Sequence, residues 1–240
     1  MSSTIKLDPI TRLEGHMKIE VEIENNKVVQ AKCTGNMFRG FESLLKGRDP
    51  RDAVHITQRI CGLCPVSHAV ASSLAIENSV GYRIGNQARL LRNLIQGGNY
   101  LADHILHFYH LSLLDYVKGP DKSLWATTYE TDLRLSRKYN KQIFNNYIKA
   151  LDIRRKAHQM VTIFSGKVPH RNVYYAWGVT KEPTREEINE YKSLLNEIKT
   201  LLIMNIIMIF KLLHLFIKII LILEKAMAIL SHMEFFLLKI

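Results

Sequence analysis

The order of apolar and polar residues divides the chain into a short β region followed by helices. Apolar and polar residues alternate from position 17 to 33, and Asn25-Asn26 in the middle tolerate the positive φ of a tight turn. This pattern predicts an antiparallel hairpin. Farther along, cap residues and an apolar repeat of three to four positions predict helices at 50–59, 65–80, 86–117, 141–164 and 185–200. Gly97-Gly98 should weaken the longest of these helices.

We therefore expect an α+β fold that is mainly α, in which the N-terminal antiparallel β-hairpin packs on a bundle of long helices. Residues 1–200 should form one domain. After residue 200 the sequence becomes rich in Ile and Leu, and one polar residue recurs every seven positions from Lys211 to Lys239. This change of composition separates residues 201–240 as an apolar tail.

The apolar tail has three candidate explanations. Lys211 and Lys218 interrupt its apolar run, so no uncharged stretch is long enough to span a membrane as a helix. On a helix, polar residues that recur every seven positions form one thin polar stripe on an otherwise apolar surface. A helix that binds a partner, or one that lies on a membrane surface, would have this pattern. A frameshifted, non-native sequence from an AT-rich gene would also show this composition, and we favour that explanation.

Charge and composition exclude some classes of function. The formal net charge is +11, but the basic residues are scattered along the chain. A Gly-rich phosphate loop and a basic-aromatic RNA motif are both absent from the sequence, so we expect no nucleic-acid partner. The N-terminal residues lack the apolar run of a signal peptide. We expect a cytoplasmic protein, or one that is exported or membrane-associated together with a partner subunit.

Residues 59–68, Arg-Ile-Cys-Gly-Leu-Cys-Pro-Val-Ser-His, carry the clearest chemistry in the sequence. A tight turn at Gly62 lets Cys61 and Cys64 direct both sulfurs at one metal ion. A helix that begins at Pro65 places both thiols near a helix N-terminus, which favours the thiolate, as does the neighbouring Arg59. His68 follows Cys64 by one helical turn.

Several kinds of site contain a Cys-x-x-Cys pair. A zinc ribbon needs a second pair at ribbon spacing, and the only other cysteine is Cys33. A thioredoxin-like dithiol follows a strand, whereas residues 50–59 are predicted to be helical. Two inert cysteines remain an alternative. A thiolate metal site completed by groups from elsewhere fits the pattern better.

The motif Arg-x-Cys-Gly-x-Cys-x-x-x-His resembles the N-terminal nickel motif of the large subunit of [NiFe] hydrogenases. The resemblance is strong over residues 4–117, loose over 140–200 and absent from 201–240. Four further blocks carry it, at residues 8–16, 38–42, 46–53 and 103–110. Together these blocks are far more specific than a Cys-x-x-Cys pair alone.

The resemblance implies a role for each matching residue. The centre would hold nickel and an iron that carries cyanide and carbon monoxide. Cys61 would be a terminal nickel ligand, Cys64 would bridge nickel and iron, and Glu42 would help to bind Mg²⁺. Without the resemblance, such acidic residues would be ordinary surface residues. The groups implied to act beside the metals are Glu14 in proton transfer, His68 as a hydrogen-bond donor to a bridging sulfur, and Asp103 and Arg59 as neighbours.

The family completes its centre with a second cysteine pair near the C-terminus, and this sequence has no cysteine after Cys64. We therefore expect the N-terminal part of a large subunit, truncated or frameshifted after about residue 200. The implied activity is reversible oxidation of H₂, with a small subunit that carries the iron–sulfur clusters and with maturation proteins as partners. Any membrane contact would be indirect or through the apolar tail.

Three alternatives remain. The chain could be an inactive fragment that only binds the small subunit, or a thiol or metal-binding protein unrelated to H₂. The related subunit of respiratory complex I lacks the nickel cysteines, so Cys61 and Cys64 argue against it.

Overall fold

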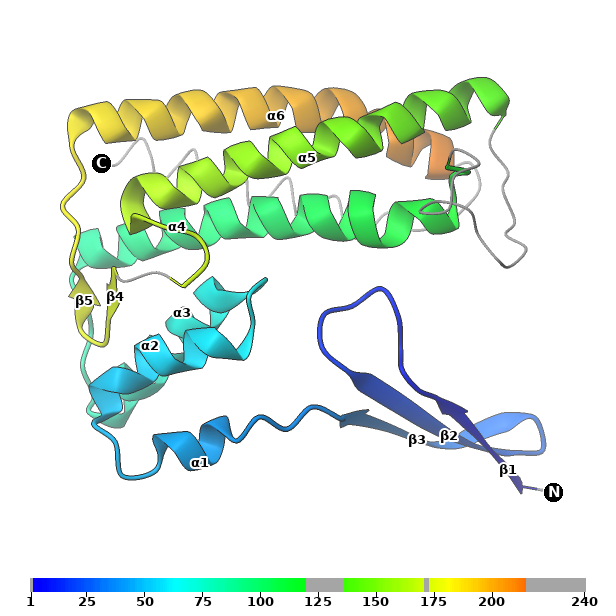
Figure 1. The fold of residues 1–240 in the computed structure, drawn as a ribbon, viewed down its shortest axis with the longest axis horizontal. Coiled ribbons are helices and arrows are strands. Elements are labelled where there is room, and N and C mark those ends of the chain that lie inside the picture. Colours follow the sequence, from blue (N-terminus) through cyan, green and yellow to red (C-terminus); the bar gives the residue numbers. More distant parts are fainter. Residues whose placement is uncertain (1, 120–135, 171–172, 215–240) are drawn as a thin grey trace.

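The computed structural model describes residues 2–119, 136–170 and 173–214, the last fourteen of these by their backbone only. Most of the structure is helical, and an antiparallel sheet stands at the N-terminus (Figure 1). This arrangement confirms the α+β, mainly α, fold expected from the sequence. Residues 215–240, which make up most of the apolar tail, lie outside the described residues.

The sheet contains the predicted hairpin and one additional strand. Strands β2 (Met17–Glu24) and β3 (Lys27–Gly35) pair antiparallel around Asn25 and Asn26, whose φ angles of 50° and 59° form the turn. Strand β1 (Ser2–Leu7), which the sequence pattern did not predict, pairs antiparallel with the other side of β2. None of the three strands contains a fully buried residue. The sheet stands beside the helices instead of packing across them (Figure 1).

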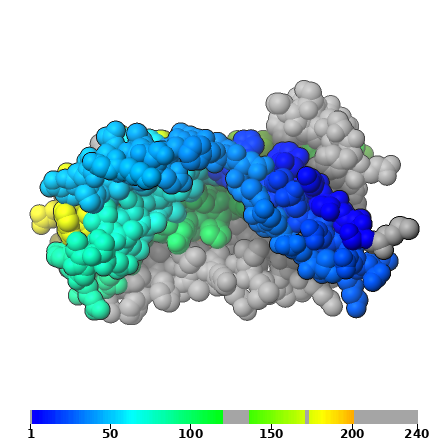
Figure 2. Space-filling model, turned by 90° about the horizontal axis from the view of Figure 1, so that it is seen from below, coloured from blue at the N-terminus to red at the C-terminus, as the bar shows by residue number. Residues whose placement is uncertain are grey.

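Short helices connect the sheet to the long ones. Helix α1 (Phe41–Leu45) follows the sheet, and the predicted helix at 50–59 is a succession of η1 (Pro50–Asp52), α2 (Ala53–Thr57) and η2 (Gln58–Ile60). Asp49 begins this succession as predicted, because its carboxylate accepts a hydrogen bond from the Arg51 N–H at 2.9 Å. Helix α3 (Pro65–Ser79) confirms the helix expected at 65–80. Figure 2 shows the sheet and residues 40–60 adjoining on one face.

The longest helices of the described residues, α4 (Asn86–Ile105), α5 (Arg137–Ser165) and α6 (Arg185–His214), lie side by side (Figure 1). Helix α4 continues into the π-helical segment η3 (Leu106–Ser112) and the turn η4 (Leu113–Asp115). Helix α5 packs between α4 and α6. Among the described helices none is long and apolar enough to cross a membrane.

Gly97-Gly98 does not interrupt α4, contrary to the expected weak spot. A Cβ atom at Gly98 would lie only 2.9 Å from Cγ2 of Val161 on α5. Glycine therefore stands here because the two helices approach closely, and the buried contacts between them compensate for its low helix propensity.

A buried ion pair fixes α3 and α4 to a small hairpin made of β4 (Tyr174–Tyr175) and β5 (Gly178–Val179). The Arg92 guanidinium lies 2.7 Å from the Glu77 carboxylate, and both side chains are about 5% exposed. Arg92 also donates hydrogen bonds to the carbonyl oxygens of Tyr175 and Gly178. The ion pair is compensated by these additional bonds, as a buried charge requires.

Candidate metal centre

The two cysteines lie where the short helices meet α3. Cys61 is extended, with φ −142° and ψ 134°, so the chain leaves η2 and turns at Gly62. Cys64 is the N-cap of α3, and Pro65 occupies the first helical turn as predicted. This local geometry brings two thiols of one short segment to the same helix N-terminus.

The sulfur of Cys61 is surrounded by donors. It accepts backbone hydrogen bonds from Leu63 at 3.2 Å and from Cys64 at 3.1 Å. Backbone N–H groups directed at a sulfur stabilise its negative charge. Burial raises the pKa of the Cys64 thiol to about 12, with a smaller contribution from its hydrogen bond to Cys61 and from the charge of Asp103. A soft cation bound between the sulfurs would displace the proton on Cys64.

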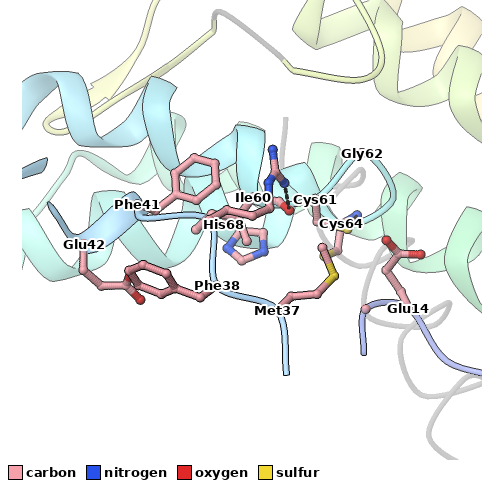
Figure 3. A pocket seen from close by; sticks show the side chains of 12 residues that line it. Glu14, Met37, Phe38, Phe41, Glu42, Ile60, Cys61, Gly62, Cys64 and His68 are labelled. Atoms are coloured by element: carbon pink, nitrogen blue, oxygen red, sulfur yellow. Dashed lines mark hydrogen bonds between the residues drawn. The ribbon is translucent and has the colours of Figure 1, made fainter. Parts of the chain in front are cut away.

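A pocket of about 410 Å³ opens at these thiols. It brings together five residues that the sequence singled out, and Figure 3 shows Glu14 and Glu42 on opposite sides of it. The five are Glu14, Glu42, Cys61, Cys64 and His68. The remaining walls consist mainly of Met37, Phe38, Phe41 and Ile60, together with the Arg39 side chain. Residues separated by more than 50 positions thus meet around the Cys-x-x-Cys turn.

His68 lies in the first turns of α3 and lines the pocket. Burial lowers the pKa of its imidazole and so favours the neutral ring. A neutral imidazole has one donor and one acceptor nitrogen, which suits a hydrogen bond to a sulfur. The implied bond from His68 to a bridging sulfur stays a prediction.

Asp103 and Arg59 do not line the pocket. Asp103 lies on α4 and accepts a hydrogen bond from the Asn99 side chain, although its charge still influences Cys64. Arg59 is exposed and donates to the carbonyl oxygen of His55 at 3.0 Å. Arg59 therefore binds the end of α2, and its guanidinium is engaged outside the pocket.

Arg39 had no predicted role of its own, although it lies in the block at residues 38–42. Its guanidinium donates to the carbonyl oxygens of Arg59 at 3.1 Å and Ile60 at 2.9 Å, the second of which is the dashed line in Figure 3. The same group lies 5.0 Å above the Phe41 ring. Through these hydrogen bonds Arg39 connects the segment before α1 to the backbone that precedes Cys61.

Comparison with known protein families matches residues 39–122 and 118–234 to the nickel-dependent hydrogenases, and residues 4–33 to a family described as HoxL-like. The chain belongs to the nickel-dependent hydrogenase family. The second matched range continues to residue 234, past residue 200, where the resemblance by motifs ended. The non-native origin of residues 201–240 stays a prediction.

Individual relatives agree with this membership. The periplasmic [NiFeSe] hydrogenase large subunit of Desulfomicrobium baculatum is 48% identical over 208 residues, which are 83% of this chain and 40% of that protein. The quinone-reactive Ni/Fe-hydrogenase large chain of Wolinella succinogenes is 35% identical over 226 residues, covering 75% of this chain and 39% of that one. The chain thus spans about 40% of the length of these relatives.

Solved structures also show the same fold. The Ni-Fe-Se hydrogenase of Desulfovibrio vulgaris Hildenborough in the reduced state superposes with a TM-score of 0.80 at 45% identity. This superposition covers 89% of the present chain and 45% of that chain. The hydrogenase of Desulfomicrobium baculatum gives a TM-score of 0.79.

The donor set of the pocket meets part of what the nickel–iron centre implied by the family requires. Two convergent sulfurs, one of them held by backbone N–H groups, fit one side of a soft-metal site. The described part of the chain contains no group of three or more His, Cys, Asp and Glu side chains that could hold a metal. Cys61 and Cys64 therefore fit part of the centre and do not complete it by themselves.

Proposed function

We propose that this chain is the N-terminal part of a catalytic large subunit that oxidises H₂ reversibly to two protons and two electrons. The proposal is carried by the pocket that Cys61, Cys64, Glu14 and Glu42 line together, in a chain that belongs to the nickel-dependent hydrogenases. Soft sulfur ligands suit nickel and low-spin iron. Reversible splitting of H₂ also needs a nearby base.

Each residue of the pocket has a distinct part in this proposal. Cys61 would be a terminal nickel ligand and Cys64 would bridge nickel and iron. When bound, the nickel–iron centre with its cyanide and carbon monoxide ligands supplies the place where H₂ is taken up and split. Glu14 then receives and passes on the proton, and Glu42 contributes to a Mg²⁺ site.

Other groups act from outside the pocket. Asp103 and Arg59 would keep their proposed places as neighbours of the centre, Asp103 through its charge and Arg59 through its backbone, which Arg39 holds. Electrons would leave through a small subunit with iron–sulfur clusters, because the described residues contain no further cysteine pair. Maturation proteins would insert the metals. The chain would be cytoplasmic, or exported or membrane-associated together with the small subunit.

Metal analysis of cysteine variants tests the proposal. The chain is produced together with the small subunit and maturation proteins, and nickel and iron are measured per purified complex. We expect Cys61→Ser and Cys64→Ser to lose most of the nickel. Cys33→Ser is the matched control, because Cys33 is exposed on β3 and does not line the pocket. Nickel that persists in a Cys61→Ser/Cys64→Ser double variant would contradict the proposal.

The same experiment separates the alternative of an inactive fragment that only binds the small subunit. A fragment of that kind would purify with the small subunit and contain neither nickel nor iron. An active subunit must contain both metals together. A protein with an unrelated thiol function would not purify with the small subunit at all.

A further inference from the structure

The pocket is formed between two parts of the chain. Glu14, Gly15, Met37 and Phe38 belong to the loops at the end of the sheet, whereas the cysteines and His68 belong to the helical part. No strand of the sheet contains a fully buried residue. The position of Glu14 relative to the sulfurs therefore depends on contacts between these loops and the helices.

The Arg12–Asp115 ion pair is a contact of this kind. Arg12 lies two residues before Glu14, and Asp115 ends η4, beyond α4. The guanidinium donates through Nη2 to Oδ1 of Asp115 at 2.7 Å and through Nε to Oδ2 at 3.2 Å. A bidentate pair fixes the orientation of the guanidinium as well as its distance.

The backbone of the loop supports a specific placement of Arg12. Its φ is 64°, a left-handed conformation that arginine rarely adopts and that surrounding contacts must hold. The hydrogen bonds from Ile10 N to the Met17 carbonyl and from Asn36 N to the His16 carbonyl, both 2.8 Å, connect the loop to the sheet. These two bonds would persist if the ion pair were lost. The ion pair instead connects the loop to the helical body.

We propose that the Arg12–Asp115 ion pair is a positioning contact that holds the Glu14 loop on the cysteine side of the pocket. This inference rests on the proposed function, in which Glu14 transfers protons. Figure 3 shows the Glu14 carboxylate on the side of the pocket occupied by Cys64. Proton transfer requires donor and acceptor within hydrogen-bond reach, directly or through one water. Arg12 and Asp115 touch no reacting atom and act through the loop.

Hydrogen exchange of the 240-residue chain tests the placement without any metal. We expect Arg12→Gln and Asp115→Asn to accelerate amide exchange of residues 8–16 by about two- to fivefold, the factor that corresponds to a partly exposed ion pair. The charge-swapped double variant Arg12→Asp/Asp115→Arg should recover part of the protection. Arg155→Gln is the matched control, because Arg155 forms a comparable pair with Asp152 on α5. Unchanged exchange in both single variants would overturn the inference.

The second measurement uses the complex of the large and small subunits. In Arg12→Gln we expect slower H₂ oxidation, unchanged nickel content and a larger ratio of the rates in H₂O and D₂O, because proton transfer becomes limiting. A merely structural role would leave that ratio unchanged, and this result would overturn the catalytic link. An unsubstituted complex without nickel would overturn the proposed function. The exchange measurement on the chain would still decide whether the ion pair holds the loop.

Discussion

Replacing Gly98 by alanine tests how closely α4 and α5 pack. The added Cβ would lie 2.9 Å from Cγ2 of Val161 and 3.5 Å from its backbone N. Carbon atoms in favourable contact are about 3.5–4.0 Å apart, so the first distance is a clash. Val161 is completely buried, and a β-branched side chain in a helix has one strongly preferred rotamer. The helices would have to separate to admit the methyl group.

Two opposing effects decide the result. Alanine is favoured over glycine in a helix interior by about 1 kcal/mol. Overpacking of a core costs about 1–3 kcal/mol. We therefore expect Gly98→Ala to lower the free energy of unfolding by about 0–2 kcal/mol, although the same substitution would raise it at an uncrowded helical position.

A double-mutant cycle isolates the contact. Val161→Ala removes Cγ2, and the nearest remaining atoms, Val161 N at 3.5 Å and the Ala157 carbonyl at 3.7 Å, are at ordinary contact distances from the new Cβ. In this background Gly98→Ala should stabilise the protein by about 1 kcal/mol, the full helix propensity. The sign of the effect therefore reverses, with a coupling energy of about 1–3 kcal/mol.

Urea unfolding followed by circular dichroism measures all four proteins. Equal m-values are required for the comparison, since a change in m indicates a change in the unfolded or native ensemble. If Gly98→Ala stabilises the protein by about 1 kcal/mol in both backgrounds, α4 and α5 do not approach as closely as the structure shows, and the explanation of this glycine is wrong.

Three further substitutions probe the polar contacts of the body. Thr184→Ala should cost about 1 kcal/mol of unfolding free energy, because it removes the hydroxyl that accepts the Glu187 N–H at 3.2 Å; thermal unfolding measures this loss. The pKa of Glu187 is lowered chiefly by its hydrogen bond to Lys181 and also by the bond from the Thr184 N–H. The ionised Glu187 carboxylate therefore stabilises the fold above its ordinary pKa, and this stabilisation is lost as the pH falls. The difference in melting temperature between the unsubstituted protein and Glu187→Gln should accordingly shrink from pH 7 to pH 3. Glu77→Gln should cost about 3–5 kcal/mol in urea unfolding, because it leaves the buried Arg92 charge without its partner; a loss below 1 kcal/mol would show that the carbonyl bonds of Arg92 suffice.

Elements with local signals could be predicted from the sequence. The hairpin around Asn25-Asn26 and the cap that begins the helix predicted at 185–200 each depend on a few adjacent residues. The structure confirms both, since Thr184 and Glu187 exchange backbone-to-side-chain hydrogen bonds at the start of α6. Strand β1 gave no such signal, because it is a six-residue edge strand whose pairing with β2 is a long-range contact. The role of Gly98 could not be predicted for the same reason, because the residue that requires a glycine there, Val161, lies on another helix.

The same distinction between local signals and long-range contacts applies to the residues of the candidate site. Cys61, Cys64 and His68 were identified from their spacing alone, because one helix N-terminus and its preceding turn bring them together. Glu14 and Glu42 are separated from them by intervening elements, so only the family resemblance connected them before the structure did. The pocket brings these five residues together but leaves their individual roles as proposals.

The structure also shows what several of the excess basic residues do. The lysines and arginines are scattered along the sequence, yet Arg12, Arg39 and Arg92 each bind two or more acceptor atoms from distant segments. A planar guanidinium can donate in several directions at once and stays charged when partly buried, which a lysine ammonium does less well. Two of these arginines, Arg12 and Arg39, connect the loops around the pocket to the helical part. Their contribution depends on contacts between residues far apart in the chain, so net charge and composition could not reveal it.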